Sequence, residues 1–190
     1  MKTLPESILE QSRCLPEGGL LTPKEFLHLG SRAAVDQAFS RLAKAGLLIR
    51  AARGLYLSSR ATPAVDKVVS ALASKSQEDI ALDGARSAKI LGLTVQVPDG
   101  NVFYTNGRTR TLQVRDLTVE IRHAPRWMLA LGATTAGAVI RAMAWLGEQR
   151  TGEVIGMLRK QLTPIDWKAL ASVRSLLPSW MALAIGRELG

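Results

Sequence analysis

The sequence lacks the residues on which several kinds of protein depend. It contains a single cysteine, Cys14, and only two histidines in 190 residues. One cysteine can form neither an internal disulfide nor a thiolate metal site. The histidines, His28 and His123, have no acidic or cysteine partner at metal-binding spacing. We therefore expect no metal and no other cofactor.

Two further absences concern membranes and secretion. No apolar stretch reaches the roughly eighteen residues of a membrane span. The chain also does not begin with a positively charged segment and an apolar run, as a signal peptide does. We expect a cytoplasmic protein, associated with the nucleoid and with no membrane partner.

Motifs of catalysis are also missing. Gly18-Gly19 is not followed by the Lys-Ser/Thr pair of a phosphate-binding loop, and no Gly-x-Gly-x-x-Gly occurs. A nucleotidyltransferase would place closely spaced aspartates on a strand after a Gly-Ser pair, but Gly30-Ser31 is followed only by Asp36. The sequence predicts a protein that is not an enzyme.

Positive charge, by contrast, is abundant. The chain has 25 Lys and Arg against 16 Asp and Glu, a net charge of +9 and a pI near 10.3. The excess lies in residues 1–60 and 123–190, whereas the middle of the chain is nearly neutral. Such a balance favours a polyanionic partner, and nucleic acid first.

The most informative stretch runs from Gly30 to Ser59. Ser31 is a good N-cap and Gly46 a good residue to follow a helix end, so a helix of about four turns is expected between them. Two short strands should follow, residues 47–51 and 55–59, joined around Arg53-Gly54. The apolar residues of the helix recur at three- and four-residue spacing and should face a core: Val35, Ala38, Phe39 and Leu42.

Two start signals precede this helix. Thr3 with Pro5 begins a first helix, and Thr22, Pro23 and Glu25 form a capping box that begins a second, predicted over residues 23–29. Three helices and a basic hairpin predict a winged helix-turn-helix domain over residues 1–60. An ordinary surface helix with a solvated basic face has the same pattern, so both interpretations stay open.

A second domain is expected over residues 61–190. Helices are predicted over residues 63–74 and 85–91, followed by strands at 93–97, 102–105, 112–114 and 117–121, with a hairpin at Asn106-Gly107. Four helical segments follow: 134–146, 151–162, 164–177 and 179–189. The fold class is therefore α+β: a winged helix-turn-helix, then a mixed domain with a small antiparallel sheet and a C-terminal helical bundle.

One loop of this domain has a recognition pattern. Residues 104–110 place Arg108 and Arg110 at the predicted hairpin tip, where arginine can contact a phosphate or an acidic partner through its bidentate fork. The alternative is a turn with solvated charges.

Several segments together resemble a known family. They are Leu82-Asp83-Gly84-Ala85-Arg86-Ser87-Ala88, Leu91-Gly92-Leu93-Thr94-Val95-Gln96-Val97-Pro98, Tyr104-Thr105-Asn106-Gly107-Arg108-Thr109-Arg110 and Ile121-Arg122-His123-Ala124-Pro125. After a terminal winged helix, they resemble the AbiEi-type antitoxins of type IV toxin–antitoxin systems.

The resemblance implies a separate role for each of the two domains. The N-terminal domain would bind inverted repeats of double-stranded DNA in its own promoter and repress the operon. The C-terminal domain would counter a nucleotidyltransferase toxin, although no residue can be assigned to that role. The candidate DNA-binding residues, by their place in the helix and the wing, are Ser31, Arg32, Gln37, Arg41, Lys44, Arg50 and Arg53.

Three alternatives stay open at this point. The chain could be a stand-alone winged-helix regulator with no toxin partner, or a module whose winged helix binds another protein. A nucleic-acid-processing enzyme is the third.

Overall fold

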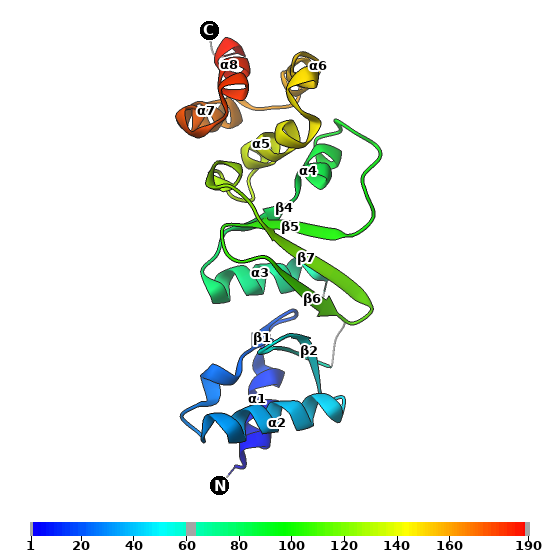
Figure 1. Cartoon of the computed structure of the whole chain (residues 1–190), viewed down its shortest axis with the longest axis vertical. Helices are drawn as coiled ribbons and strands as arrows, with labels where there is room; N and C mark the ends of the chain where they lie inside the picture. The colour runs from blue at the N-terminus through cyan, green and yellow to red at the C-terminus, as the bar shows by residue number, and fades with distance from the viewer. Residues whose placement is uncertain (1, 60–63, 189–190) are drawn as a thin grey trace. The chain divides into compact units, whose positions relative to one another are not determined.

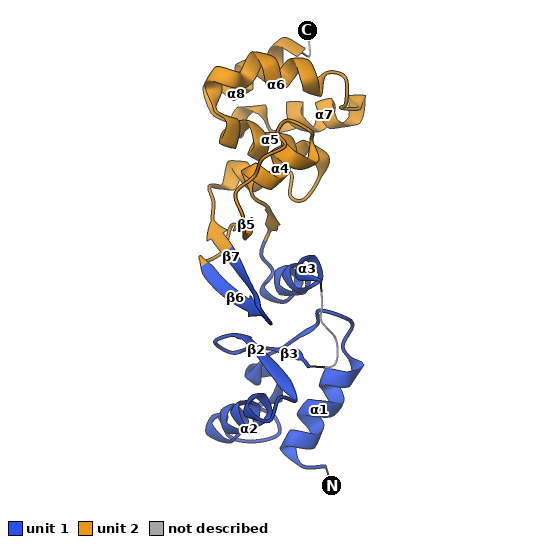
Figure 2. Ribbon diagram, turned by 90° about the vertical axis from the view of Figure 1, so that its right-hand side faces the viewer, with its two compact units in different colours: residues 1–78, 110–120 blue, residues 79–109, 121–190 orange. Residues whose placement is uncertain are grey.

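The computed structural model describes residues 2–59 and 64–188 and has an α+β fold (Figure 1). The chain divides into two compact units (Figure 2). The first comprises Met1–Glu78 and Arg110–Glu120, and the second Asp79–Thr109 and Ile121–Gly190. The domain boundary predicted between residues 60 and 61 falls within residues 60–63, which lie outside the described residues, and the first unit extends beyond it to Glu78.

The first unit begins with three helices and three short strands. A three-stranded sheet has the order β1-β3-β2, and both of its neighbouring pairs are antiparallel. The elements are α1 (Leu4–Cys14), β1 (Leu20–Leu21), the 3-10 helix η1 (Pro23–Phe26), α2 (Arg32–Lys44), β2 (Leu48–Ala52) and β3 (Leu55–Ser58).

The second predicted helix is shorter than expected. Thr22 and Glu25 form the predicted capping box, in which the Thr22 N–H donates to Glu25 Oε2 at 2.7 Å. The helix nevertheless ends at Phe26 and is a 3-10 helix, so the prediction over residues 23–29 was wrong in length and type. Leu27 and Leu29 are 42% and 44% exposed, so extending the helix over them would bury little additional apolar surface.

The core of this unit is built around α2. The Phe39 ring lies between two other aromatic rings, with its centroid 5.4 Å from that of Phe26 and 4.7 Å from that of Tyr56. The rest of the cluster is aliphatic and comes from α1, β1, α2 and β2: Ile8, Leu21, Val35, Ala38, Leu42 and Leu48. Helix α2 is thus held by its apolar face against one continuous core.

Helix α3 (Val65–Ser76) also belongs to this unit. Lys75 donates from Nζ to the Leu20 carbonyl at 2.7 Å and to Glu25 Oε1 at 2.5 Å. Gly18, with φ at +81°, approaches α3 so closely that a Cβ would lie 2.8 Å from the Lys67 backbone. These contacts explain why residues 64–78 join the first unit.

The second sheet differs from the predicted antiparallel sheet. Its strands are β4 (Ile80–Leu82), β5 (Asn101–Thr105), β6 (Arg110–Val114) and β7 (Leu117–His123), in the order β4-β5-β7-β6. Strands β5 and β6 are not neighbours, so the hairpin predicted at Asn106-Gly107 was wrong. Neither residue adopts the positive φ that a type I′ turn requires. The hairpin joins β6 to β7 instead, and Arg115 supplies a φ of 53° at its turn.

Asn106 has a different role from the predicted one. Its side chain donates from Nδ2 to Asp79 Oδ2 at 2.8 Å and accepts the Asp79 N–H at 3.1 Å. The Ala124 N–H donates to the Thr105 carbonyl at 2.9 Å, which places the ends of β5 and β7 together and makes the sheet mixed.

The strand predicted over residues 93–97 was also wrong. Leu93 is buried, but Val95 is 88% exposed, and the segment belongs to no sheet. Alternating apolar residues did not produce a buried strand face, because only the first of them reaches the core.

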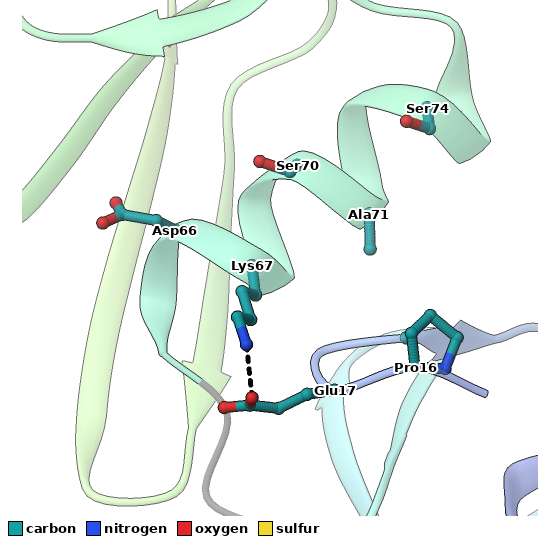
Figure 3. Close-up of a pocket in the computed structure, with 8 residues that line it drawn as sticks. Pro16, Glu17, Asp66, Lys67, Ser70, Ala71 and Ser74 are labelled. Atoms are coloured by element: carbon teal, nitrogen blue, oxygen red, sulfur yellow. Dashed lines mark hydrogen bonds and ion pairs between the residues drawn. The ribbon is translucent and has the colours of Figure 1, made fainter.

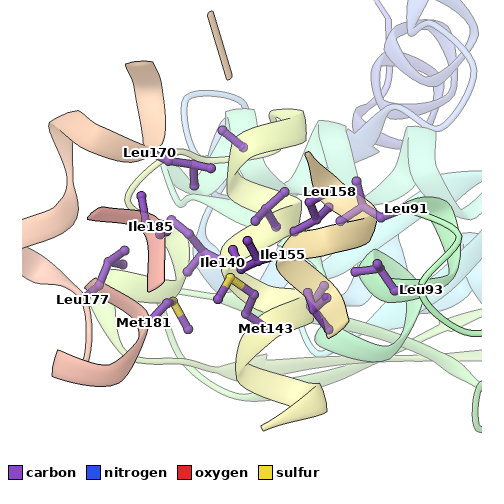
Figure 4. Packing of buried hydrophobic residues seen from close by; sticks show 14 of the residues in the cluster. Leu91, Leu93, Ile140, Met143, Ile155, Leu158, Leu170, Leu177, Met181 and Ile185 are labelled. Atoms are coloured by element: carbon purple, nitrogen blue, oxygen red, sulfur yellow. The ribbon is translucent and has the colours of Figure 1, made fainter. Parts of the chain in front are cut away.

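The second unit carries the predicted C-terminal helices. The helices of this unit are α4 (Gly84–Ile90), η2 (Arg126–Leu129), α5 (Thr135–Leu146), η3 (Glu148–Arg150), α6 (Thr151–Leu158), α7 (Pro164–Ser172), η4 (Arg174–Leu176) and α8 (Ser179–Glu188). Their apolar faces form one cluster, in which Ile140, Met143, Leu158, Leu170 and Met181 are buried (Figure 4).

Among the described residues of this unit, Arg141 is the one charged side chain that is buried. Arg141 of α5 is 2% exposed, and its Nη1 donates to the carbonyls of Gly132 at 2.8 Å and Met128 at 3.2 Å. Burial lowers the pKa of the Arg141 guanidinium to about 10. Arg141 thus connects α5 by hydrogen bonds to η2 and to the segment that follows η2.

Candidate nucleic-acid interface

Helix α2 is capped by a side chain at its start and by backbone hydrogen bonds at its end. At its start the Ser31 Oγ accepts the Ala34 N–H at 3.3 Å. At its end Gly46 has a φ of 71°, the Leu47 N–H donates to the Leu42 carbonyl, and the Gly46 N–H donates to the Ala43 carbonyl, each at 3.0 Å. This pair of bonds is a Schellman motif, which ends the helix and turns the chain directly into β2.

The two faces of α2 differ as the sequence predicted. Val35, Ala38, Phe39 and Leu42 are buried in the core. The predicted DNA-binding residues of this helix and its cap are all exposed: Ser31, Arg32, Gln37, Arg41 and Lys44. The unit therefore presents a polar helix face to the outside.

The β2–β3 hairpin adds two exposed cations. Ile49 pairs with Leu57 and Arg50 with Tyr56, and the register shifts between Arg50 and Ala52. Arg53 lies in the connection to β3 beside Gly54, whose φ is 73°. Arg50 and Arg53 are both exposed, so all seven predicted residues are accessible within one compact unit.

The charge of this surface is strongly positive. Residues 31–59 contain five basic side chains and one acidic side chain, Asp36. The side chains of Arg41, Lys44, Arg50 and Arg53 have no hydrogen-bond or ion-pair partner among residues 2–59 and 64–188. We call these four residues, with Arg32, the cationic surface.

Asp36 also lies on this surface, although it was not among the predicted DNA-binding residues. Its Oδ2 accepts a hydrogen bond from Arg32 Nε at 2.8 Å, and the two side chains are 48% and 58% exposed. The four-residue spacing of opposite charges on a predicted helix would have indicated the pair.

The arginines predicted at the loop tip do not form a joint site. Arg110 is bound to Glu78, with Nη1 donating to Oε1 at 3.2 Å and Nη2 to Oε2. These side chains are only 25% and 17% exposed, so Arg110 has a structural partner and is not free for a phosphate. Arg108 is exposed, but it belongs to the other unit.

His123 closes the loop in which Arg108 lies. Its Nδ1 is 2.8 Å from the Gly107 carbonyl oxygen, and its backbone N–H donates to Thr109 Oγ1 at 2.9 Å. His123 therefore has a local structural role.

A pocket of about 390 Å³ lies elsewhere in the first unit (Figure 3). Pro16, Glu17 and Gly19 line one side, and α3 lines the other with residues that include Lys67 and Ser70. The hydrogen bond and charge of Lys67 lower the pKa of the Glu17 carboxyl, since the two side chains form an ion pair across the pocket. The described parts of the chain contain no cluster of three potential metal ligands.

No helix in the described ranges is long and apolar enough to cross a bilayer. The fold and the exposed surface define an α+β protein with a cationic helix and hairpin on its first unit. The chain belongs to a family of unknown function (DUF6088), whose profile matches residues 7–164. No curated protein matches the sequence.

A solved structure supports the fold assignment. The chain is similar to the crystal structure of the Rv2827c protein from Mycobacterium tuberculosis, with a TM-score of 0.50. The alignment has 14% sequence identity and covers 97% of this chain and 75% of that one. At this identity the likeness concerns the fold alone.

Proposed function

We propose that the chain is a regulator that binds double-stranded DNA through a winged helix-turn-helix. In this proposal α2 enters the major groove and the β2–β3 hairpin is the wing that contacts the neighbouring backbone. A major groove admits one α-helix, and base edges and phosphates lie within reach of its exposed side chains.

One observation carries the proposal. The large apolar residues of α2, Val35, Phe39 and Leu42, are buried in the core, while the candidate contact residues of α2 and the hairpin are all exposed and carry an excess of positive charge. Because α2 is capped at both ends, its exposed side chains project from a rigid element, which lowers the entropy lost on binding.

Salt dependence tests this proposal. Four phosphate contacts, from Arg41, Lys44, Arg50 and Arg53, should make log K fall by about 3.6 for each tenfold increase in salt, at about 0.9 per contact. A mobility-shift titration on the region upstream of the gene measures this slope. R53A should reduce the slope by about 0.9.

Lys160 supplies the matched control. It is an exposed cation of the second unit, so K160A removes the same charge without touching the proposed interface. Equal slopes for R53A and K160A would contradict the assignment of the wing, and a wild-type protein that retards no duplex at low salt would contradict DNA binding altogether.

The resemblance to AbiEi-type antitoxins supports a second part of the proposal. The chain represses its own operon at inverted repeats, and residues 61–190 counter a nucleotidyltransferase toxin encoded beside it. Growth assays separate the two roles. The neighbouring nucleotidyltransferase gene, expressed alone, should arrest growth, and co-expression of this chain should restore it.

Variants of α2 make this assay specific. R41A should lose repression of a reporter placed behind the promoter and still restore growth, because α2 lies outside residues 61–190. Failure of the wild-type chain to restore growth, with repression intact, would leave a stand-alone regulator.

A further inference from the structure

The pair formed by Arg32 and Asp36 is not explained by the stability of α2. Arg32 is the first residue of the helix, and the first turn contains no acidic residue. A cation there opposes the helix dipole, which is positive at the N-terminal end. The pair also has the less favourable order, since an acidic residue placed four positions before a basic one stabilises a helix better than the reverse.

The geometry leaves the recognition end of Arg32 available. Asp36 Oδ2 holds Nε at 2.8 Å, while Nη1 and Nη2 donate to no residue within the described ranges. A guanidinium fixed through Nε presents these two groups side by side. Guanine offers two acceptors at matching spacing in the major groove, O6 and N7.

We propose that Arg32 reads a guanine in the bound DNA and that Asp36 is a positioning residue that sets this specificity. The inference rests on the proposed DNA-binding function. Asp36 fixes the orientation of the Arg32 guanidinium before binding, so less side-chain conformational entropy is lost when Nη1 and Nη2 bind the guanine. As the one acidic side chain among residues 31–59, Asp36 also repels phosphates, which weakens binding to DNA that offers no guanine at this position.

Selection from a library of duplexes with a randomised core tests the inference on the full chain. The wild-type protein should enrich a motif with a fixed guanine, and R32A should lose the preference at that one position. D36A should lower the preference for this guanine over adenine by roughly tenfold, the scale of one bidentate contact. Its affinity for duplexes without the motif should stay the same or increase.

The Arg150–Glu153 pair provides the control. It is also an exposed ion pair close in sequence, but it lies in the second unit. E153Q should leave both the selected motif and the affinity unchanged. D36A should also unfold at the wild-type temperature, because an exposed pair of this kind contributes little to stability.

The possible outcomes distinguish failure of this inference from failure of the proposed DNA-binding function. A motif without a fixed guanine, or a D36A protein that keeps the guanine preference, would overturn the inference and leave DNA binding in place. Equal loss of affinity for all duplexes in D36A would show that the pair supports the helix, and would also overturn it. If the wild-type chain enriches no duplex, the proposed function fails and the inference with it.

Discussion

Gly84 provides a strict test of how the second unit is packed. It is the first residue of α4, and a Cβ at this position would lie 2.5 Å from Trp145 Cβ and 2.6 Å from the Arg141 carbonyl oxygen of α5. Both atoms are fixed by the backbone of α5. Alanine could therefore be accommodated only if the two helices move apart.

The magnitude follows from two opposing effects. Overpacking of this kind typically costs about 1–3 kcal/mol. Replacing glycine by alanine in a helix contributes about 1 kcal/mol in the other direction. Contacts at 2.5 Å with fixed atoms cannot be relieved by a side-chain rotation, so the overpacking cost should lie in the upper part of its range, at about 2–3 kcal/mol. After the helix-propensity gain of about 1 kcal/mol, we expect G84A to lower the free energy of unfolding by about 1–2 kcal/mol.

Gly156 is the matched control. It lies inside α6, and a Cβ there would meet no atom within 4 Å. G156A should therefore raise stability by about 0.5–1 kcal/mol through helix propensity alone. Urea unfolding followed by tryptophan fluorescence suits both variants, because all four tryptophans lie in the second unit. A G84A protein as stable as wild type would refute the close packing of α4 on α5.

Two further variants test ion pairs. E78Q should destabilise the first unit by about 1–3 kcal/mol, because the partly buried Arg110 loses its counter-charge. E10Q, in the exposed pair with Lys2, should change stability by less than about 0.5 kcal/mol. The midpoints of denaturant unfolding compare the two variants. Hydrogen bonds and charge from Arg159 lower the pKa of Glu188 below its ordinary 4.5. E188Q should therefore be less stable than wild type at neutral pH, and melting curves at decreasing pH should show the difference disappear as Glu188 protonates, below pH 4.5.

Local signals in the sequence predicted much of the fold. The cap residue Ser31, the glycine at position 46 and the spacing of the apolar residues defined α2 to within a residue at each end. The C-terminal helices of the second unit also begin within one residue of their predicted starts, as α5 does at Thr135 after its cap Thr134. Each of these features depends on interactions within one or two helical turns.

The errors arose where distant residues decide the structure. Asn106-Gly107 permits a hairpin but does not require one, and two hydrogen bonds with Asp79, one in each direction, give Asn106 another role. The same holds for the candidate loop site, because nothing near Arg110 in the sequence indicates that Glu78 binds its guanidinium. Strand neighbours and ion pairs over such separations cannot be derived from local periodicity.

The proposed interface combines two kinds of contact that should fail in different ways. Arg41, Lys44, Arg50 and Arg53 have long side chains without partners among the described residues, so they suit phosphates and would determine affinity and its salt dependence. Arg32 is held by Asp36 on a capped helix, and a fixed donor pair is what discrimination between bases requires. If the interface works in this way, substitutions in the first group change the salt slope without changing the selected motif. Substitutions of the Arg32–Asp36 pair change the motif, and D36A should do so while leaving the salt slope almost intact.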